Sequence, residues 1–128
     1  MPGAESGVVI AVDDDVAVLA SLKFALEVEG FPVRGYRSAE EMLAGDLPEA
    51  PACLVVDLRL PGIDGLALVA ALRARGMDCP AILTTTDPPP QVRRRAEAAG
   101  LTIVEKPLLG NGLAETIRAV LAAPRGQV

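Results

Sequence analysis

The residues best suited to chemistry in this chain are three aspartates, a threonine and a lysine, and each group follows a short apolar run. In order these are Asp13 and Asp14 after residues 8–12, Asp57 after 53–56, Thr85 after 81–83 with Thr84 between, and Lys106 after 102–104 with Glu105 between. Such runs are typical of strands buried on both faces of a parallel sheet. Ligands bind at the carboxyl-end edge of such a sheet, so these side chains are predicted to meet there.

The predicted cluster has a definite chemistry. Three carboxylates repel one another unless they take up protons or recruit a cation, and oxygen donors suit a hard ion, so we expect Mg²⁺. A lysine can neutralise a phosphoryl oxygen, a hydroxyl can donate a hydrogen bond to it, and a carboxylate can attack phosphorus. The residue types therefore predict an aspartyl-phosphate site.

Four segments give the chain a resemblance to a known family. They are Val12 to Asp15, Asp57 to Gly65, the threonine run at 84–86, and Glu105-Lys106-Pro107. Together they resemble the receiver domain of bacterial two-component response regulators, from about residue 8 to residue 121. Residues 30–33 and 36–41 are most similar to the FixJ-type subgroup.

The resemblance implies a role for each candidate residue. Asp57 is implied to be the phosphoacceptor, while Thr85 and Lys106 bind the phosphoryl oxygens, and the Lys106–Pro107 bond is implied to be cis. Thr85 is preferred over its neighbours Thr84 and Thr86 by its distance from Asp57 and by the alignment of Pro80. The implied ligands of Mg²⁺ are Asp13, Asp14, Asp57 and the backbone carbonyl of Arg59.

Simpler interpretations exist for each residue taken alone. The acidic pair could cap the first helix, because acidic side chains favour helix N-termini. Asp57 could be a turn residue at a strand end, and Lys106 could be a surface cation. Their joint presence in this order favours the phosphorylation site.

The remaining pattern alternates strands with helices. We expect strands at 8–12, 32–36, 53–56, 81–84 and 102–105, and helices at 16–29, from Ser38 to near Gly45, and at 66–75, 90–99 and 113–121. Ser38 and Glu41 predict a capping box, and Asp64 is expected to cap a helix. Gly30 is expected to end the first helix in a left-handed conformation. Five such units with right-handed crossovers make a doubly wound α/β sheet, for which the resemblance implies a flavodoxin-like fold and strand order 2-1-3-4-5.

Composition limits the class of protein. With 128 residues, 51 % of them hydrophobic, the chain is expected to form one receiver domain at 8–122, between tails at 1–7 and 123–128, without an output domain. A net charge of −5 argues against nucleic-acid binding. Neither a membrane-length apolar stretch nor a signal peptide is evident, so we expect no membrane association and a cytoplasmic protein. Cys53 and Cys79 are expected to be neighbouring buried thiols.

Two functions follow from this sequence. The first is a single-domain response regulator that accepts a phosphoryl group from a histidine kinase or phosphotransfer protein, and signals by contact with a downstream protein as a monomer or weak dimer. It would be no enzyme beyond catalysing its own phosphorylation and dephosphorylation. The alternative is a constitutive adaptor that binds its partner without phosphorylation. Ile103, where the family usually carries an aromatic residue, and the prolines at 88–90 predict a damped response.

Overall fold

A five-stranded parallel sheet forms the centre of this computed structural model, which describes residues 7–48, 51–108 and 110–122. The strand order is β2-β1-β3-β4-β5, and every neighbouring pair is parallel. This confirms the doubly wound sheet and the order expected from the sequence. The strands are β1 (Val9–Val12), β2 (Val33–Tyr36), β3 (Cys53–Asp57), β4 (Ala81–Thr85) and β5 (Thr102–Glu105).

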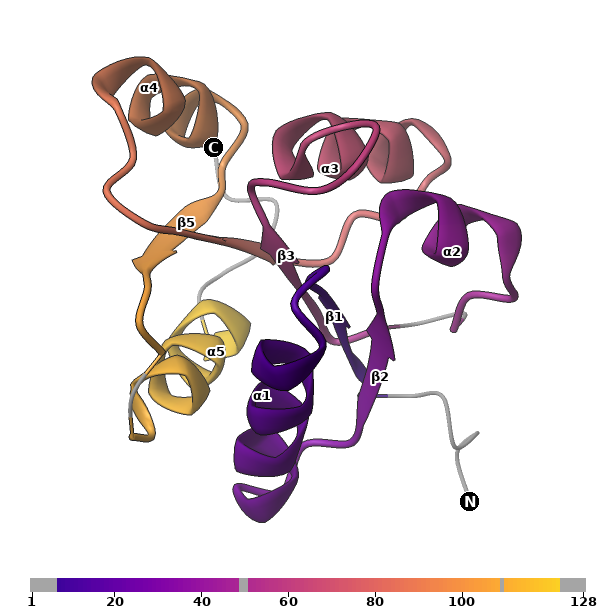
Figure 1. Cartoon of the computed structure of the whole chain (residues 1–128), viewed down its shortest axis with the longest axis vertical. Helices are drawn as coiled ribbons and strands as arrows, with labels where there is room; N and C mark the ends of the chain where they lie inside the picture. Colours follow the sequence, from indigo (N-terminus) through magenta and orange to yellow (C-terminus); the bar gives the residue numbers. More distant parts are fainter. Residues whose placement is uncertain (1–6, 49–50, 109, 123–128) are drawn as a thin grey trace.

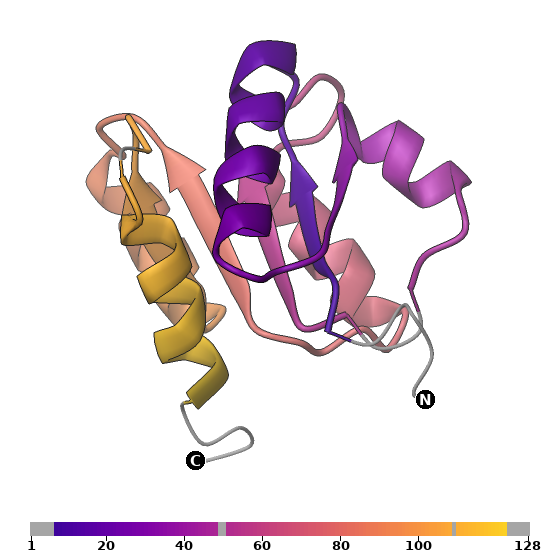
Figure 2. The ribbon, with the colours of Figure 1, turned by 90° about the horizontal axis from the view of Figure 1, so that it is seen from below.

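Five helices cover the two faces of the sheet in the described part of the chain. Helices α1 and α5 lie on one face, and α2, α3 and α4 lie on the other (Figure 1; Figure 2). Each element ends within about a residue or two of its expected bounds, which is the usual uncertainty of helix and strand ends. The helices are α1 (Val16–Val28), α2 (Ala39–Ala44), α3 (Gly65–Ala74), α4 (Pro90–Ala98) and α5 (Gly112–Ala122).

The apolar strands divide their side chains between two cores, because successive residues of a strand point to opposite faces. Val55 and Ile82 belong to the core under α1 and α5. Leu54 and Leu83 belong to the core under α2, α3 and α4. This alternation decides on which face the residues at each strand end lie.

Polar caps set where the helices begin. The Asp15 carboxylate accepts hydrogen bonds from the amides of Ala17 and Val18 at the start of α1. Ser38 Oγ accepts from the Glu41 amide at 3.0 Å. In a capping box the Glu41 carboxylate would accept a hydrogen bond from the amide of the N-cap residue Ser38. Here it accepts from the amide of the preceding residue, Arg37, at 2.7 Å. The carboxylate caps the chain entering the helix instead of the N-cap itself.

The other expected stop and cap are also present. Gly30 follows Glu29, the C-cap residue of α1, and has φ +98°, a left-handed conformation that favours glycine. The Asp64 carboxylate accepts from the Ala67 amide at the start of α3. The two cysteines are buried, and burial, followed by the charge of Cys79, raises the pKa of the Cys53 thiol to about 12. Of the helices in the described ranges, none is both long and apolar enough to cross a membrane.

Candidate functional site

Three aspartates meet at the carboxyl ends of β1 and β3. Asp13 and Asp14 directly follow β1, and Asp57 is the last residue of β3. These strands are neighbours, with Val12 paired to Val56, so the residues that follow them lie side by side. One carboxylate oxygen from each aspartate lies within 4.8 Å of the others. Asp13 and Asp57 are only 2 % and 6 % exposed, whereas Asp14 is exposed to solvent.

Lys106 reaches these carboxylates from the end of β5. Its Nζ lies 2.9 Å from Asp57 Oδ1 and 3.0 Å from Asp13 Oδ2. Its backbone amide donates to the carbonyl of Thr85 at 2.8 Å, which ties the lysine to the end of β4. The peptide bond between Lys106 and Pro107 is cis, as the resemblance implied. The ammonium group therefore bridges two aspartates from different strands.

The two buried threonines at the end of β4 lie on opposite faces of the sheet. Thr84 is paired with Asp57 and lies on the face of α1 and α5, because Ile82 of the same strand packs there. Thr85, 3 % exposed, lies on the face of α3 and α4, with Leu83. Counting along the sequence did not reveal that Thr84 is the threonine in register with Asp57. The role of Thr85 stays a prediction.

Burial and charge perturb the pKa values at this site. Burial is the main cause of the raised pKa of Asp57, and the charges of Asp13 and Asp14 add to it, while Lys106 acts in the opposite direction. For Lys106, burial lowers the pKa, but the hydrogen bonds and charges of Asp57 and Asp13 outweigh burial and raise it. Lys106 is thus held in its charged form, and Asp57 lacks enough positive charge nearby to stabilise its carboxylate fully.

The donor set fits a divalent metal ion. When all groups are ionised, three carboxylates and one ammonium leave a net charge of −2. A hard dication with a preference for oxygen ligands would neutralise that charge, and Mg²⁺ has these properties. Arg59 follows Asp57 by two residues in the loop between β3 and α3, and its carbonyl stays a predicted further ligand.

Gly65, the first residue of α3, packs against the carboxyl end of β3. Its amide donates to the Leu58 carbonyl at 2.8 Å. A Cβ atom at this position would collide with the carbonyl oxygen of Asp57, and would lie only 3.0 Å from side-chain atoms of Val56 and Leu83. A glycine is therefore needed to hold the start of α3 against the strand that carries Asp57.

Comparison with known proteins shows that this chain is similar to members of one protein family. The family described as "Response regulator receiver domain" matches residues 9–118. The transcriptional regulatory protein FixJ of Azorhizobium caulinodans is 36 % identical over 118 residues, which are 91 % of this chain and 56 % of FixJ. The C4-dicarboxylate transport transcriptional regulatory protein DctD of Rhizobium meliloti is 34 % identical over 112 residues, which are 86 % of this chain and 24 % of DctD.

Solved structures with the same fold cover nearly the whole chain. A CheY-like response regulator receiver domain protein from Methanospirillum hungatei has a TM-score of 0.78 at 30 % identity, and covers 91 % of this chain and 94 % of its own. The non-phosphorylated HemR receiver domain from Leptospira biflexa has a TM-score of 0.84 at 24 % identity, and covers 96 % and 100 %. The chain spans only about half the length of FixJ and a quarter of DctD.

Proposed function

This chain belongs to the response regulator receiver domain family, and we propose that its Asp57 accepts a phosphoryl group from a histidine kinase or phosphotransfer protein. The observation that carries the proposal is the contact of Asp57 Oδ1 with Lys106 Nζ at 2.9 Å, next to Asp13 and Asp14. An acceptor carboxylate needs a cation close enough to bind the oxygens of the incoming phosphoryl group. The ammonium group of Lys106, in contact with Asp57, is such a cation.

The transfer follows from the arrangement of these groups. An Asp57 oxygen forms a bond to phosphorus as the phosphorus–nitrogen bond of the donor histidine breaks. Lys106 binds a phosphoryl oxygen, and the Thr85 hydroxyl donates a hydrogen bond to another after a movement of the loop that follows β4. Asp13, Asp14, Asp57 and the Arg59 carbonyl would hold Mg²⁺, which would offset the negative charge of the donor and the acceptor. Water later attacks the same phosphorus and the bond from phosphorus to the Asp57 oxygen breaks, which releases inorganic phosphate and restores the carboxylate.

The signal then passes by contact with another protein. The phosphoryl group binds Lys106 and Thr85 more tightly in one loop arrangement than in another, and so shifts a pre-existing equilibrium. A downstream protein reads the shifted surface, and the chain acts as a cytoplasmic monomer or weak dimer without a nucleic-acid partner. The domain is proposed to span residues 8–122.

Phosphate labelling tests the acceptor. A small phosphodonor with Mg²⁺ should add one phosphoryl group to the wild-type chain, and Asp57→Asn should remove the labelling. Asp46→Asn, at an exposed aspartate outside the site, is the matched control and should be labelled like the wild type. Labelling of the Asp57→Asn variant at the wild-type level would sink the assignment.

The threonine needs its own test, because two candidates stand at the end of β4. We expect Thr85→Val to weaken binding of a beryllium fluoride phosphoryl mimic, since a hydrogen bond to the mimic is lost. Thr84→Val is equally conservative and equally buried, and should leave the affinity unchanged. The reverse result would move the hydroxyl's role to Thr84, the threonine paired with Asp57.

A second candidate function is a constitutive adaptor with this fold. Two features near α4 favour it. Ile103 packs against the core, and three prolines at 88–90 lead into α4, of which the last is its first residue. An aliphatic side chain and a proline-rich loop both limit movement in response to phosphorylation. Binding of a partner measured with and without beryllium fluoride and Mg²⁺ separates the two functions, because an adaptor would bind equally in both conditions.

A further inference from the structure

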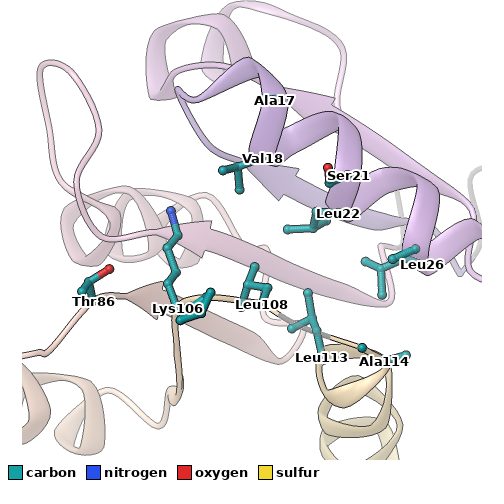
Figure 3. A pocket seen from close by; sticks show the side chains of 13 residues that line it. Ala17, Val18, Ser21, Leu22, Leu26, Thr86, Lys106, Leu108, Leu113 and Ala114 are labelled. Atoms are coloured by element: carbon teal, nitrogen blue, oxygen red, sulfur yellow. The ribbon is translucent and has the colours of Figure 1, made fainter.

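A pocket of about 530 Å³ lies between α1 and α5, and Lys106 stands at one end of it (Figure 3). Its walls are mostly apolar, with Leu22 and Leu26 from α1 facing Leu113 and Ala114 from α5. Its volume and its few polar groups are typical of sites for small molecules. The sequence did not indicate this pocket, because its two walls are about 90 residues apart in the chain.

The side chain of Lys106 links the pocket to the carboxylate cluster, whose aspartates do not themselves line the pocket. The Lys106 stem lines the pocket, and its Nζ extends beyond it to Asp57 and Asp13. The side chain of Thr86 lies at the same end of the pocket as Lys106. A molecule in the pocket would therefore have its polar end beside Lys106, whose Nζ lies 2.9 Å from Asp57 Oδ1, and its apolar end between the helices.

The charges restrict what that polar end can be. The three aspartates and Lys106 carry a net charge of −2, which disfavours a simple anion at this end in the absence of a metal ion. In the proposed function the same residues, with Mg²⁺ bound, take up a phosphoryl group. The ligand that satisfies both ends is a phosphate ester or anhydride with an apolar substituent.

We propose that this pocket receives the apolar leaving group of a small phosphodonor, an acyl phosphate whose hydrocarbon chain lies between α1 and α5. The inference rests on the proposed function of Asp57. In the reaction, an Asp57 oxygen forms a bond to phosphorus and the bond from phosphorus to the acyl oxygen breaks. The carboxylate of the acyl chain leaves with the electron pair, so the step needs neither a proton nor a further reactant. The pocket thus selects among donors by their chain.

Two donors of equal intrinsic reactivity test the inference on the full chain. With Mg²⁺, we expect hexanoyl phosphate to label Asp57 with a second-order rate constant about tenfold higher than acetyl phosphate, because its longer chain fills the apolar pocket. Labelling is followed by intact mass. Equal rate constants for the two donors would overturn the inference. Because acetyl phosphate needs no pocket, it still reports on the proposed function alone, and failure of both donors would refute that function as well.

A matched pair of variants shows whether the pocket causes the preference. Ser21→Phe places a ring in the pocket, and should abolish the preference for hexanoyl phosphate over acetyl phosphate. Ala20→Phe adds the same ring at an exposed neighbouring position that does not line the pocket, and should keep the preference. A preference that survives in Ser21→Phe contradicts the assignment.

Binding without transfer gives an independent measurement. Hexylphosphonate has the same apolar chain but no bond that can transfer phosphorus to Asp57. With Mg²⁺, it should shift the amide signals of the residues of α1 and α5 that line the pocket, among them Leu22, Leu26 and Leu113. Shifts confined to other parts of the chain would place the donor's chain elsewhere and refute the inference.

Discussion

Replacing the buried acceptor carboxylate by its neutral isostere should stabilise the protein when no metal ion is present. Asp57 is 6 % exposed, and one of its oxygens lies within 4.8 Å of oxygens from Asp13 and Asp14. Asp57→Asn keeps the shape of the side chain and removes one negative charge from this cluster. Lys106 keeps its ion pair with Asp13 at 3.0 Å in this variant.

The size of the effect follows from the distances. At an effective dielectric constant of about 20, each repulsion across at most 4.8 Å costs at least about 3.5 kcal/mol, and the attraction to Lys106 across 2.9 Å contributes about 5.7 kcal/mol. Two repulsions against one attraction therefore leave at least about 1 kcal/mol in favour of the neutral side chain. The raised pKa of Asp57, caused chiefly by burial, has the same sign. For a domain of this size, about 1 kcal/mol raises Tm by about 3 to 5 °C.

Thermal unfolding in a chelating buffer of low ionic strength at pH 7 measures this gain. Asp46→Asn removes an exposed charge outside the site and should change stability by less than about 0.5 kcal/mol. Added Mg²⁺ should then reverse the order of the wild type and Asp57→Asn, because an ion that binds only the folded wild-type site stabilises it. A lower Tm of Asp57→Asn in chelator, or an equal rise in the control variant, would refute the repulsion argument.

Three further predictions concern pH, packing and the response to phosphorylation. Because the pKa of Asp57 is raised on folding, the folded state binds more protons than the unfolded state. The metal-free free energy of unfolding should therefore fall as the pH rises from about 4 through the raised pKa. Urea unfolding at several pH values should show a smaller fall for Asp57→Asn than for the wild type. Gly65→Ala should cost about 1 to 3 kcal/mol or more in urea unfolding because its Cβ meets the backbone of β3, whereas Gly112→Ala, where a Cβ would meet nothing, should not destabilise. A phosphoryl mimic should shift amide signals mainly in the loops after β1, β3 and β4, and large shifts across residues 90–104 would show that Ile103 transmits the change by repacking.

Local patterns in the sequence determined the elements and most of the candidate site. Apolar runs specify the buried strands β1, β3 and β4, whereas the run in β5 forms a partly exposed strand at the edge of the sheet. Asp15, Ser38 and Asp64 cap helices through bonds to amides two or three residues away. Because parallel strands bring their carboxyl ends to one edge, the residues after each run could be grouped without coordinates. The resemblance to the family supplied the strand order and the roles of these residues.

Tertiary structure alone decided the features that depend on register and on packing between distant segments. The bridge from Lys106 to Asp13 and Asp57 joins residues at the carboxyl ends of three strands, and no spacing along the chain specifies its distances. Strand register placed Thr84, not its neighbour, beside Asp57. The pocket arises where α1 packs next to α5, so its shape depends on how two separate helices sit on one face of the sheet. Such features follow from side-chain packing across the whole fold, which local sequence does not encode.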